Sequence, residues 1–316
     1  MNVCVSIVTA TFNRVITLPR VYESLVSQTC KDFEWLVVDD GSQDSTQEYV
    51  IGLIDNAPFP IRYIYKENGG NHTALNVGVK EAKGQYVTFL DSDDAMMPDV
   101  VEYGINAWAN LESHEEYFSV FGRAIYENGQ LMGTPFPDTF NSLPHYKLQR
   151  AWRTKYKCDG IAFARTSILK RHPYPEPNGM KHIWPSITGY EIRALYKIFY
   201  TNHIFIVAYQ DQENRHSQGG GPGFAQVRCK STWLLDFHTI NKIWLIDKSW
   251  SVSEKYNVIR RFVVNAYRLG KTPKDIYMGF TRPVIRVFIT TVYISAYLLA
   301  KAMGKSFIHH IERIST

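Results

Sequence analysis

Four short apolar stretches in the first ninety residues alternate with segments whose apolar residues repeat at helical spacing. The apolar stretches cover residues 3–10, 33–39, 61–66 and 85–91, and the helical patterns cover residues 18–26, 45–54 and 73–81. This alternation predicts right-handed β-α-β units, because strands joined by helices form a mainly parallel sheet with helices on both faces. The front of the chain is therefore expected to be an α/β domain.

Polar side chains follow three of these strands at the points where they end. In open α/β sheets, ligands bind beyond the carboxyl ends of the strands. We therefore expect the three clusters to converge on one edge of the sheet and to form a binding site there. The clusters are Thr9, Thr11 and Asn13, then Asp39-Asp40-Gly41-Ser42, and finally Asp91-Ser92-Asp93-Asp94.

The Asp91-Ser92-Asp93 cluster carries two carboxylates at positions i and i+2. From a turn, both can face one point and hold a hard divalent cation such as Mg²⁺ or Mn²⁺ alongside substrate phosphates. The alternative is an Asp-rich turn that caps the helix expected near Pro98. The second acidic cluster, Asp39-Asp40, favours the ligand site because it ends another strand of the same sheet.

Neither a GxGxxG nor a GxxxxGK[ST] motif occurs, which excludes a standard dinucleotide fold and a P-loop nucleotidase. The segment Asn68-Gly69-Gly70-Asn71-His72 fits a ligand cradle and fits equally a plain turn before a helix. Lys66, near the end of a strand, is expected to be solvated. Farther along, we expect a strand at 158–163, a helix at 190–200 and a strand at 203–209. Residues 211–223 are polar and glycine-rich, as in a lid or a linker.

The net charge of +5 is divided unevenly along the chain. Residues 224–316 carry 15 Lys and Arg against 5 Asp and Glu, a net +10, whereas residues 1–223 carry 20 against 25, a net −5. We therefore expect two parts, a domain at 1–223 and a basic helical extension at 224–316. Such a basic part suits nucleic acid, anionic lipid or a phosphorylated ligand. No RNA- or DNA-binding motif is present, so no nucleic-acid partner is expected.

The basic extension carries three helical patterns. The first includes Trp233 to Trp244, the second opens at Ser251-x-x-Glu254 and ends near Gly270, and the third begins near Val284. Between Arg286 and Lys301 lie 14 uncharged residues, and about 20 are needed to span a bilayer. We therefore expect no transmembrane helix.

The spacing of the cysteines and the composition of the first residues indicate the cellular compartment. The four cysteines share no short spacing, which excludes a CxxC zinc ribbon or redox pair. The opening residues lack the basic and long apolar regions of a secretory signal. We expect a protein kept in a reducing cytosol.

Several motifs together resemble family 2 glycosyltransferases. They are VSIVTATFNR at residues 5–14, VVDDGSQDST at 37–46, Ala74-Leu75-Asn76-x-Gly78, and AKGQYVTFLDSDD at 82–94. The resemblance covers residues 3 to about 110. It implies a GT-A fold and an inverting, metal-dependent transfer from a nucleotide sugar, usually a UDP-sugar.

The resemblance also assigns roles to the polar clusters. Thr9 and Asp40 would hold the nucleoside, with Asp40 accepting from the uracil ring. Asp91 would lie near the ribose and donor sugar, and Asp93 would bind the metal, Mn²⁺ or Mg²⁺, that bridges the diphosphate. The remaining donor-side residues are Thr11, Asn13, Asp39, Asn71 and Ser92. The QxxRW motif of processive synthases is missing after residue 200, so repeated addition is not expected.

Two further groups complete the expected site. Members of this family place an acid at the start of a helix in the acceptor half, and Glu191 matches as the catalytic base, because it opens the helix expected at 190–200. One alternative is that Glu191 is only a charge at a helix terminus. The other is that Asp159 is the base; if it is not, Asp159 is expected to hold the acceptor. Arg215 and His216 lie in the segment where a lid over the diphosphate is expected. There they would pair with phosphate or complete the set of metal ligands. The alternative is that both are solvated loop residues.

The sequence therefore predicts a non-processive, inverting glycosyltransferase of surface polysaccharide synthesis. Its acceptor is a saccharide or a lipid-linked saccharide. The competing hypothesis is a degenerate GT-A domain that binds a nucleotide sugar or a partner without turnover. Residues 287–300, flanked by basic residues, favour an amphipathic helix in peripheral contact with the inner face of the membrane. A buried helix or a homodimer contact is the alternative for that segment.

Overall fold

The computed structural model describes residues 3–143, 147–148, 151, 155–156, 158–210, 222–243 and 250–303. The chain divides into two compact units, residues 1–219 and 220–316. The strands, in chain order, are β1 (Val5–Thr11), β2 (Phe33–Asp39), β3 (Ile61–Tyr65), β4 (Tyr86–Phe89), β5 (Ala95–Met96), β6 (Tyr117–Tyr126), β7 (Gly160–Arg165) and β8 (Lys197–Ala208).

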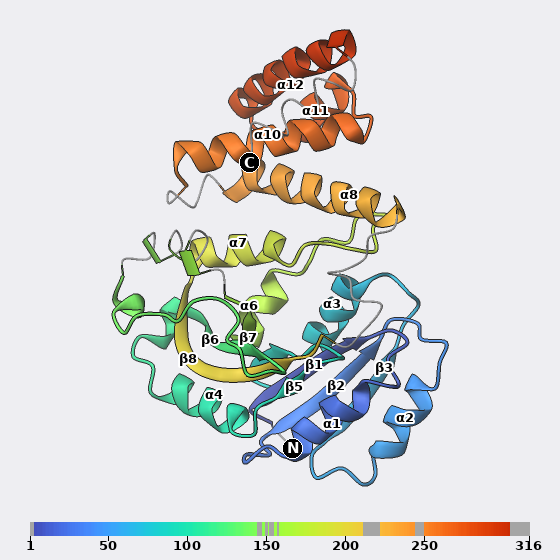
Figure 1. Ribbon diagram of the computed structural model, residues 1–316, viewed down its shortest axis with the longest axis vertical. Helices are drawn as coiled ribbons and strands as arrows, with labels where there is room; N and C mark the ends of the chain where they lie inside the picture. Colours follow the sequence, from blue (N-terminus) through green and yellow to red (C-terminus); the bar gives the residue numbers. More distant parts are fainter. Residues whose placement is uncertain are drawn as a thin grey trace. The chain divides into compact units, whose positions relative to one another are not determined.

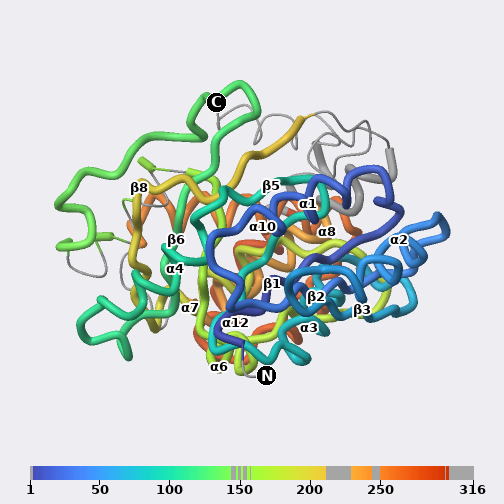
Figure 2. Tube along the Cα trace, turned by 90° about the horizontal axis from the view of Figure 1, so that it is seen from below, coloured from blue at the N-terminus to red at the C-terminus, as the bar shows by residue number. Residues whose placement is uncertain are grey.

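The first unit contains one mixed sheet with the strand order β3-β2-β1-β4-β7-β6-β8-β5. Strands β1 to β4 are parallel to one another, β7 runs antiparallel to β4 and β6, and β8 runs parallel to β6 (Figure 1). Strands β6 and β8 lie side by side in both views (Figure 2). The α/β prediction and the four parallel strands are confirmed.

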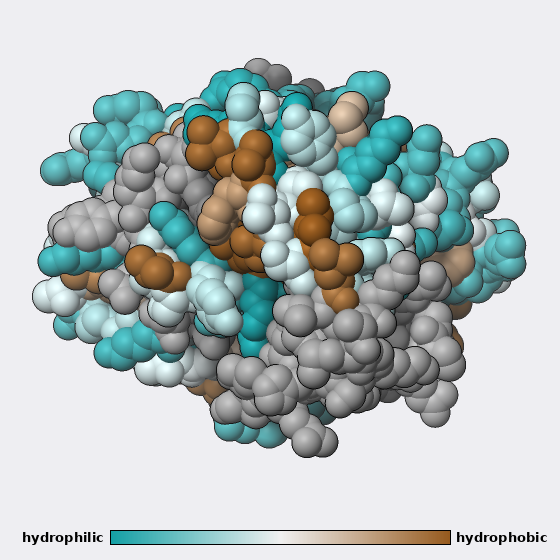
Figure 3. Space-filling view, turned by 90° about the horizontal axis from the view of Figure 1, so that it is seen from above, coloured by the Kyte–Doolittle hydropathy of each residue, from teal (hydrophilic) through white to brown (hydrophobic). Residues whose placement is uncertain are grey.

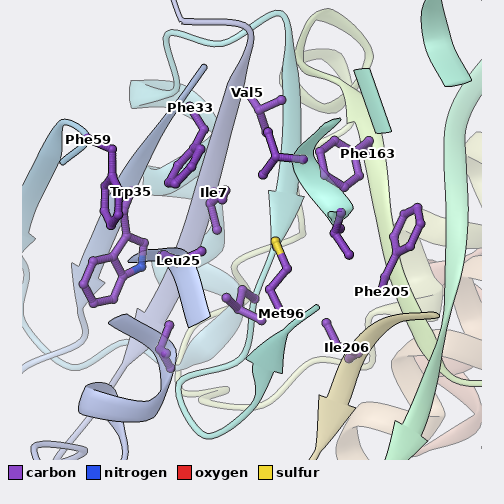
Figure 4. Close-up of a cluster of buried hydrophobic side chains, with 14 of the residues drawn as sticks. Val5, Ile7, Leu25, Phe33, Trp35, Phe59, Met96, Phe163, Phe205 and Ile206 are labelled. Atoms are coloured by element: carbon purple, nitrogen blue, oxygen red, sulfur yellow. The ribbon is translucent and has the colours of Figure 1, made fainter. Parts of the chain in front are cut away.

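Helices cover both faces of this sheet, because alternate side chains of a strand point to opposite faces. Figure 4 shows part of the core on the first face, with Phe33 and Trp35 on one side, Phe163 and Phe205 on the other, and Met96 between them. The first face is covered by α1 (Leu18–Val26), α2 (Thr46–Leu53) and α4 (Val100–Ala109), and the second by α3 (Asn71–Glu81), α6 (Thr166–Arg171) and α7 (Ser186–Leu195). The short 3-10 turns are His114–Glu116 and Phe140–Ser142.

The expected helix at 190–200 is wrong in its bounds. Helix α7 begins four residues earlier, after Pro185, and ends at Leu195, and residues 197–208 form the single strand β8. The run from Ile198 to Thr201 is β-branched and aromatic, which suits a strand at a packed sheet surface. The helical pattern at 45–54 forms α2, and the Ser45 side chain before it makes no capping hydrogen bond.

The second unit is helical. Its elements are α8 (Pro222–His238), a π-helical turn (Thr239–Ile243), α10 (Val252–Arg268), α11 (Pro273–Gly279) and α12 (Pro283–Met303). The capping box at Ser251 and Glu254 and the left-handed Gly270 after α10 are confirmed. Phe262 and Phe280 pack together in the core, and the buried Asp236 pairs with Arg261. Burial raises the pKa of Asp236 to about 6, against the effect of Arg261. Within the described residues, none of the helices combines the length and apolarity that crossing a membrane requires.

Glu34 on β2 joins three parts of the first unit and gives a stability prediction. The buried carboxylate accepts hydrogen bonds from Ser6 Oγ (2.6 Å), Lys83 N (2.9 Å) and Arg62 Nη1 (3.1 Å). We expect Glu34→Gln to lower the free energy of unfolding by about 3 kcal/mol at pH 7, because it leaves buried donors unpaired. Denaturant titration measures this loss, and Glu48→Gln, on the exposed side of α2, should change stability by less than about 0.5 kcal/mol.

The same carboxylate predicts a pH dependence. Burial alone would raise the pKa of Glu34, but its hydrogen bonds to Ser6, Lys83 and Arg62 outweigh burial and lower the pKa. A lowered pKa means that the unfolded chain takes up the proton first as the pH falls. The stabilisation is therefore complete at neutral pH and is lost below the ordinary value of 4.5. The difference between wild type and Glu34→Gln should shrink in that range, and a difference that grew there would contradict the assignment.

Candidate functional site

The loops that follow β1 and β2 are hydrogen-bonded to each other. Asp40 N donates to Thr11 O (2.8 Å), and Asn13 N donates to Ser42 Oγ (2.8 Å). Asn13 Oδ1 in turn accepts from Gln43 N (2.8 Å), while Asn13 itself has φ 52°. The two polar clusters therefore form one continuous edge of the sheet, as expected.

Asp39 and Asp40 have different surroundings although they are neighbours. Asp39 is fully buried, and its oxygens accept from Ser42 N (2.7 Å) and Tyr63 OH (2.6 Å). Burial, followed by the adjacent Asp39 carboxylate, raises the pKa of Tyr63 well above its usual range. Asp39 therefore positions the turn after β2, and we do not place it in contact with a ligand.

The Asp40 carboxylate organises the segment before α3. Its Oδ1 accepts from Lys66 Nζ (2.6 Å) and Gly69 N (2.9 Å), and its Oδ2 accepts from Gly70 N (2.8 Å). The expectation that Lys66 is solvated is wrong, because the lysine pairs with Asp40. A carboxylate offers about four lone-pair sites, so these three bonds leave Oδ2 able to accept one more donor.

The hydroxyls of Thr9 and Thr11 on β1 differ in their hydrogen bonding. Thr9 is buried and its Oγ1 accepts from Trp35 Nε1 (3.0 Å). Thr11 is also buried, but its Oγ1 has no hydrogen-bond partner among the described residues. A buried hydroxyl without a partner costs about 1–3 kcal/mol, which points to a ligand group at Thr11. The Thr9 hydroxyl is used within the fold.

The Asp91-Ser92-Asp93 turn connects β4 to β5. Ser92 is buried, Asp93 is half-buried and Asp91 is exposed. Arg20 Nη1 of α1 donates to Asp93 O (2.9 Å), so the backbone of Asp93 is what fixes the turn. The Asp93 carboxylate makes no hydrogen bond to the described part of the chain that would compete with a ligand.

The end of β8 lies against this turn. Tyr209 N donates to Asp94 Oδ1 (3.2 Å), and the guanidinium carbon of Arg20 lies 3.7 Å from the centre of the Tyr209 ring. The chain that leaves β8 therefore passes beside the acidic turn at Tyr209. Arg215 and His216 lie outside the described residues.

We tested whether the acidic turn suits a divalent cation. No group of three or more His, Cys, Asp or Glu side chains stands ready to hold a metal in the ranges that the structure describes. A closed, all-protein metal cage therefore does not fit these residues. Mg²⁺ is commonly held by one or two carboxylates plus substrate phosphates, and the accessible Asp91 and Asp93 carboxylates fit that arrangement.

The acceptor-side acids lie on α7 and before β7. Glu191 is the sixth residue of α7, so it does not start the helix, and the argument from the helix dipole is wrong. Its Oε1 lies 3.6 Å from His172 Nδ1, and both side chains are partly buried. Asp159 is exposed, and its Oδ1 accepts from Gly160 N (2.8 Å).

The sequence pattern that defines glycosyl transferase family 2 matches residues 6–172, which is more than half of the chain. The chain belongs to glycosyltransferase family 2. The matched residues include β1 from Ser6 onward, β2 to β4, and all three polar clusters of the site.

The relatives named here match less than half of this family 2 chain. An uncharacterized glycosyltransferase of Rickettsia felis is 33% identical over 147 residues, which are 44% of this chain and 24% of that protein. Chondroitin synthase of Pasteurella multocida is 41% identical over 98 residues, 31% of this chain and 10% of that protein. The chain therefore spans about a quarter and a tenth of these two relatives.

Solved structures show the same GT-A fold. Residues 1–349 of Staphylococcus aureus TarS, in complex with UDP-GlcNAc, superpose with a TM-score of 0.56 at 17% identity, over 95% of this chain and 92% of that one. The mannosyltransferase PcManGT of Pyrobaculum calidifontis, with GDP-Man and Mn²⁺, gives a TM-score of 0.56 at 16% identity, over 95% and 87%. The expected GT-A fold is confirmed.

Within this family 2 site, sequence reasoning missed His72. Asn71 and His72 form the first turn of α3, where Asn71 is exposed and His72 is 3% exposed. Neither ring nitrogen of His72 has a hydrogen-bond partner among the described residues. Burial lowers the pKa of His72 and keeps the ring neutral. Its position two residues after Gly70 was the available signal, but only burial distinguishes it from a surface histidine.

Gly70 makes the segment before α3 sensitive to substitution. Its φ is +98°, and a Cβ there would lie 2.1 Å from Lys181 O. We expect Gly70→Ala to weaken nucleotide-sugar binding tenfold or more, because a loss of about 1.4 kcal/mol in the contacts to Asp40 already gives that factor. Calorimetry measures the affinity. Gly129→Ala is the matched control, with φ +80° and open space around the Cβ, and equal binding by both variants would remove this segment from the donor site.

Proposed function

We propose that this protein transfers a single sugar from a nucleotide sugar, UDP-linked, to a hydroxyl group of a saccharide or lipid-linked saccharide. The observation that carries the proposal is the shared edge of β1, β2 and β4. There Asp40 with one free acceptor site, the unpartnered Thr11 hydroxyl and the accessible Asp93 carboxylate lie within the family 2 segment. The similar solved structures contain UDP-GlcNAc in one case and GDP-Man with Mn²⁺ in the other, which supports a nucleotide sugar and a divalent cation as classes of ligand.

In the proposed reaction, the donor lies across this edge. Asp40 Oδ2 accepts an N–H of the base, Thr11 contributes its hydroxyl, and Asp91 lies near the ribose and sugar. Asp93 would hold Mn²⁺ or Mg²⁺, which when bound neutralises charge on the departing diphosphate. The acceptor oxygen attacks the anomeric carbon as the bond to the diphosphate oxygen breaks. Glu191 takes the acceptor proton, and a single displacement inverts the anomeric configuration.

Three further proposals concern the place of this activity, the number of sugars added and the closure of the site. A lipid-linked acceptor of surface polysaccharide synthesis would put the reaction at the cytoplasmic face of a membrane. The absence of the processive QxxRW motif after residue 200 favours one addition at a time. Arg215 and His216 are proposed to close over the diphosphate.

The experiment that tests the function is a nucleotide-sugar panel with Mn²⁺ and the full chain. We expect release of nucleoside diphosphate from one donor, faster with a suitable acceptor, and an inverted anomeric centre in the product by NMR. The second candidate is a domain that binds without turnover, favoured by the placement of Glu191 within α7 rather than at its start. Tight donor binding with no release from any donor would establish that candidate and overturn the transferase.

A further inference from the structure

Helix α12 is apolar on the side that packs and on the side that does not. Ile289 and Tyr293 are buried within the second unit, where α12 packs on α11 and α10. At 100° per residue, the exposed apolar side chains fall on the opposite side of the helix. These define the α12 stripe, which consists of Val284, Val287, Phe288, Ile294 and Leu298, each between 38% and 82% exposed. The described exposed side of α12 is therefore mainly apolar.

Among the described side chains, the side of α12 that carries the α12 stripe has no charged residue. The polar residues on that side are Thr291 and Ser295, and their Oγ atoms donate back to the helix carbonyls of Val287 (2.8 Å) and Thr291 (3.0 Å). Hydroxyls that bond within their own helix are tolerated in a water-free environment. Figure 3 shows several groups of brown, hydrophobic side chains between pale and teal ones on one face. A helix that is apolar all round is normally covered on all sides.

Basic and aromatic groups lie on α11 and at the start of α12. Arg282 and Lys274 are exposed, and the Arg286 guanidinium carbon lies 5.0 Å from the centre of the exposed Tyr277 ring. Beside Tyr277, Met278 is also exposed. Tyrosine and arginine next to an apolar surface are typical of helices at the headgroup level of a bilayer.

The charge of the second unit decides between the possible occupants. Residues 224–316 carry a net +10, so pairing two copies through this unit would bring like charges together, whereas anionic lipid neutralises them. We propose that the α12 stripe lies in the headgroup region of an anionic bilayer, with α12 parallel to the membrane plane. This contact is independent of the transfer reaction.

Vesicle flotation with the full chain tests the proposal. We expect binding to phosphatidylcholine vesicles that contain phosphatidylglycerol, weaker binding without it, and further weakening as salt is raised. The double substitution Val287→Ser and Phe288→Ser should lower the affinity at least tenfold, since each removes an exposed apolar side chain that the bilayer would bury. Arg282→Gln should lower it about fivefold.

Controls distinguish binding through the α12 stripe from nonspecific binding to vesicles and from loss of the fold. Tyr256→Ser removes an aromatic ring of similar exposure, 61%, from α10, and should bind vesicles like wild type. Thermal unfolding and donor hydrolysis should be the same in every variant. The proposal is overturned if the double variant binds vesicles as well as wild type. It is also overturned if anionic lipid does not increase vesicle binding by the wild-type protein. The same holds if the only effect of the substitutions is to convert a dimer to a monomer in sedimentation.

Discussion

Replacing Asp93 with asparagine should reduce sugar transfer about a thousandfold or more while the protein keeps its fold. The turn that carries Asp93 is fixed through the backbone, because Arg20 donates to the Asp93 carbonyl oxygen rather than to its carboxylate. Asparagine therefore leaves the turn in place and removes one negative oxygen. If that oxygen binds the metal, several kcal/mol of charge stabilisation are lost with it, and each 1.36 kcal/mol is tenfold in rate.

Release of nucleoside diphosphate measures the rate, and thermal unfolding checks the fold. Asp99→Asn is the matched control, because this carboxylate lies six residues farther on and faces His203 Nε2 at 3.0 Å. We expect the control to retain its activity. EDTA should inactivate the wild-type protein, and Mn²⁺ should restore it. Full activity of the metal-free protein would refute the role assigned to Asp93.

The parallel half of the sheet was predictable because its signals are local. Each strand from β1 to β4 is a short apolar run followed by a polar turn, and each intervening helix carries its own periodicity. Since parallel strands end at the same edge, the meeting of Thr11 and Asp40 followed from the topology alone. The capping box of α10 was likewise readable, because all its partners lie within four residues.

The differences between neighbouring site residues were not predictable. Asp39 and Asp40 look alike in sequence, and only the tertiary contacts to Tyr63 and to Gly69-Gly70 separate them. The close approach of Lys181 to Gly70 joins residues more than a hundred positions apart. Such long-range contacts have no local pattern, so sequence reasoning could not distinguish a cradle from a turn there.

The prediction of the boundary between α7 and β8 was wrong for a different reason. The apolar residues from Ile192 to Phe199 satisfy a helical spacing and also a buried strand, and periodicity alone does not separate the two. The sheet decided the outcome, because β8 pairs with β6 along residues 197–208. That shift moved Glu191 from the expected helix start into the body of α7.

Glu191→Gln should lower the turnover number about a hundredfold or more, the usual scale of general-base catalysis, with donor affinity unchanged. Glutamine keeps the size of the side chain and removes its basicity. Glu191 is held on a rigid element, because α7 packs against the sheet through the buried Ile192, and its Oε1 lies 3.6 Å from His172 Nδ1. A base must be aimed within a few tenths of an ångström, and these contacts restrict the carboxylate in that way.

The competing explanation is that Glu191 only anchors α7 to His172, and matched variants distinguish the two roles. Glu176→Gln is the control for the removal of a carboxylate in the same part of the chain. Glu176 lies in the segment before α7, and its Oε1 accepts from Asn76 Nδ2 (2.6 Å). An anchoring role predicts that Glu191→Gln lowers the melting temperature and changes turnover no more than Glu176→Gln does. A base predicts the opposite, with stability retained and single-turnover chemistry slowed. If Glu191→Gln reacted normally and Asp159→Asn did not, the base would be Asp159, whose exposed carboxylate bonds only to Gly160 N among the described residues.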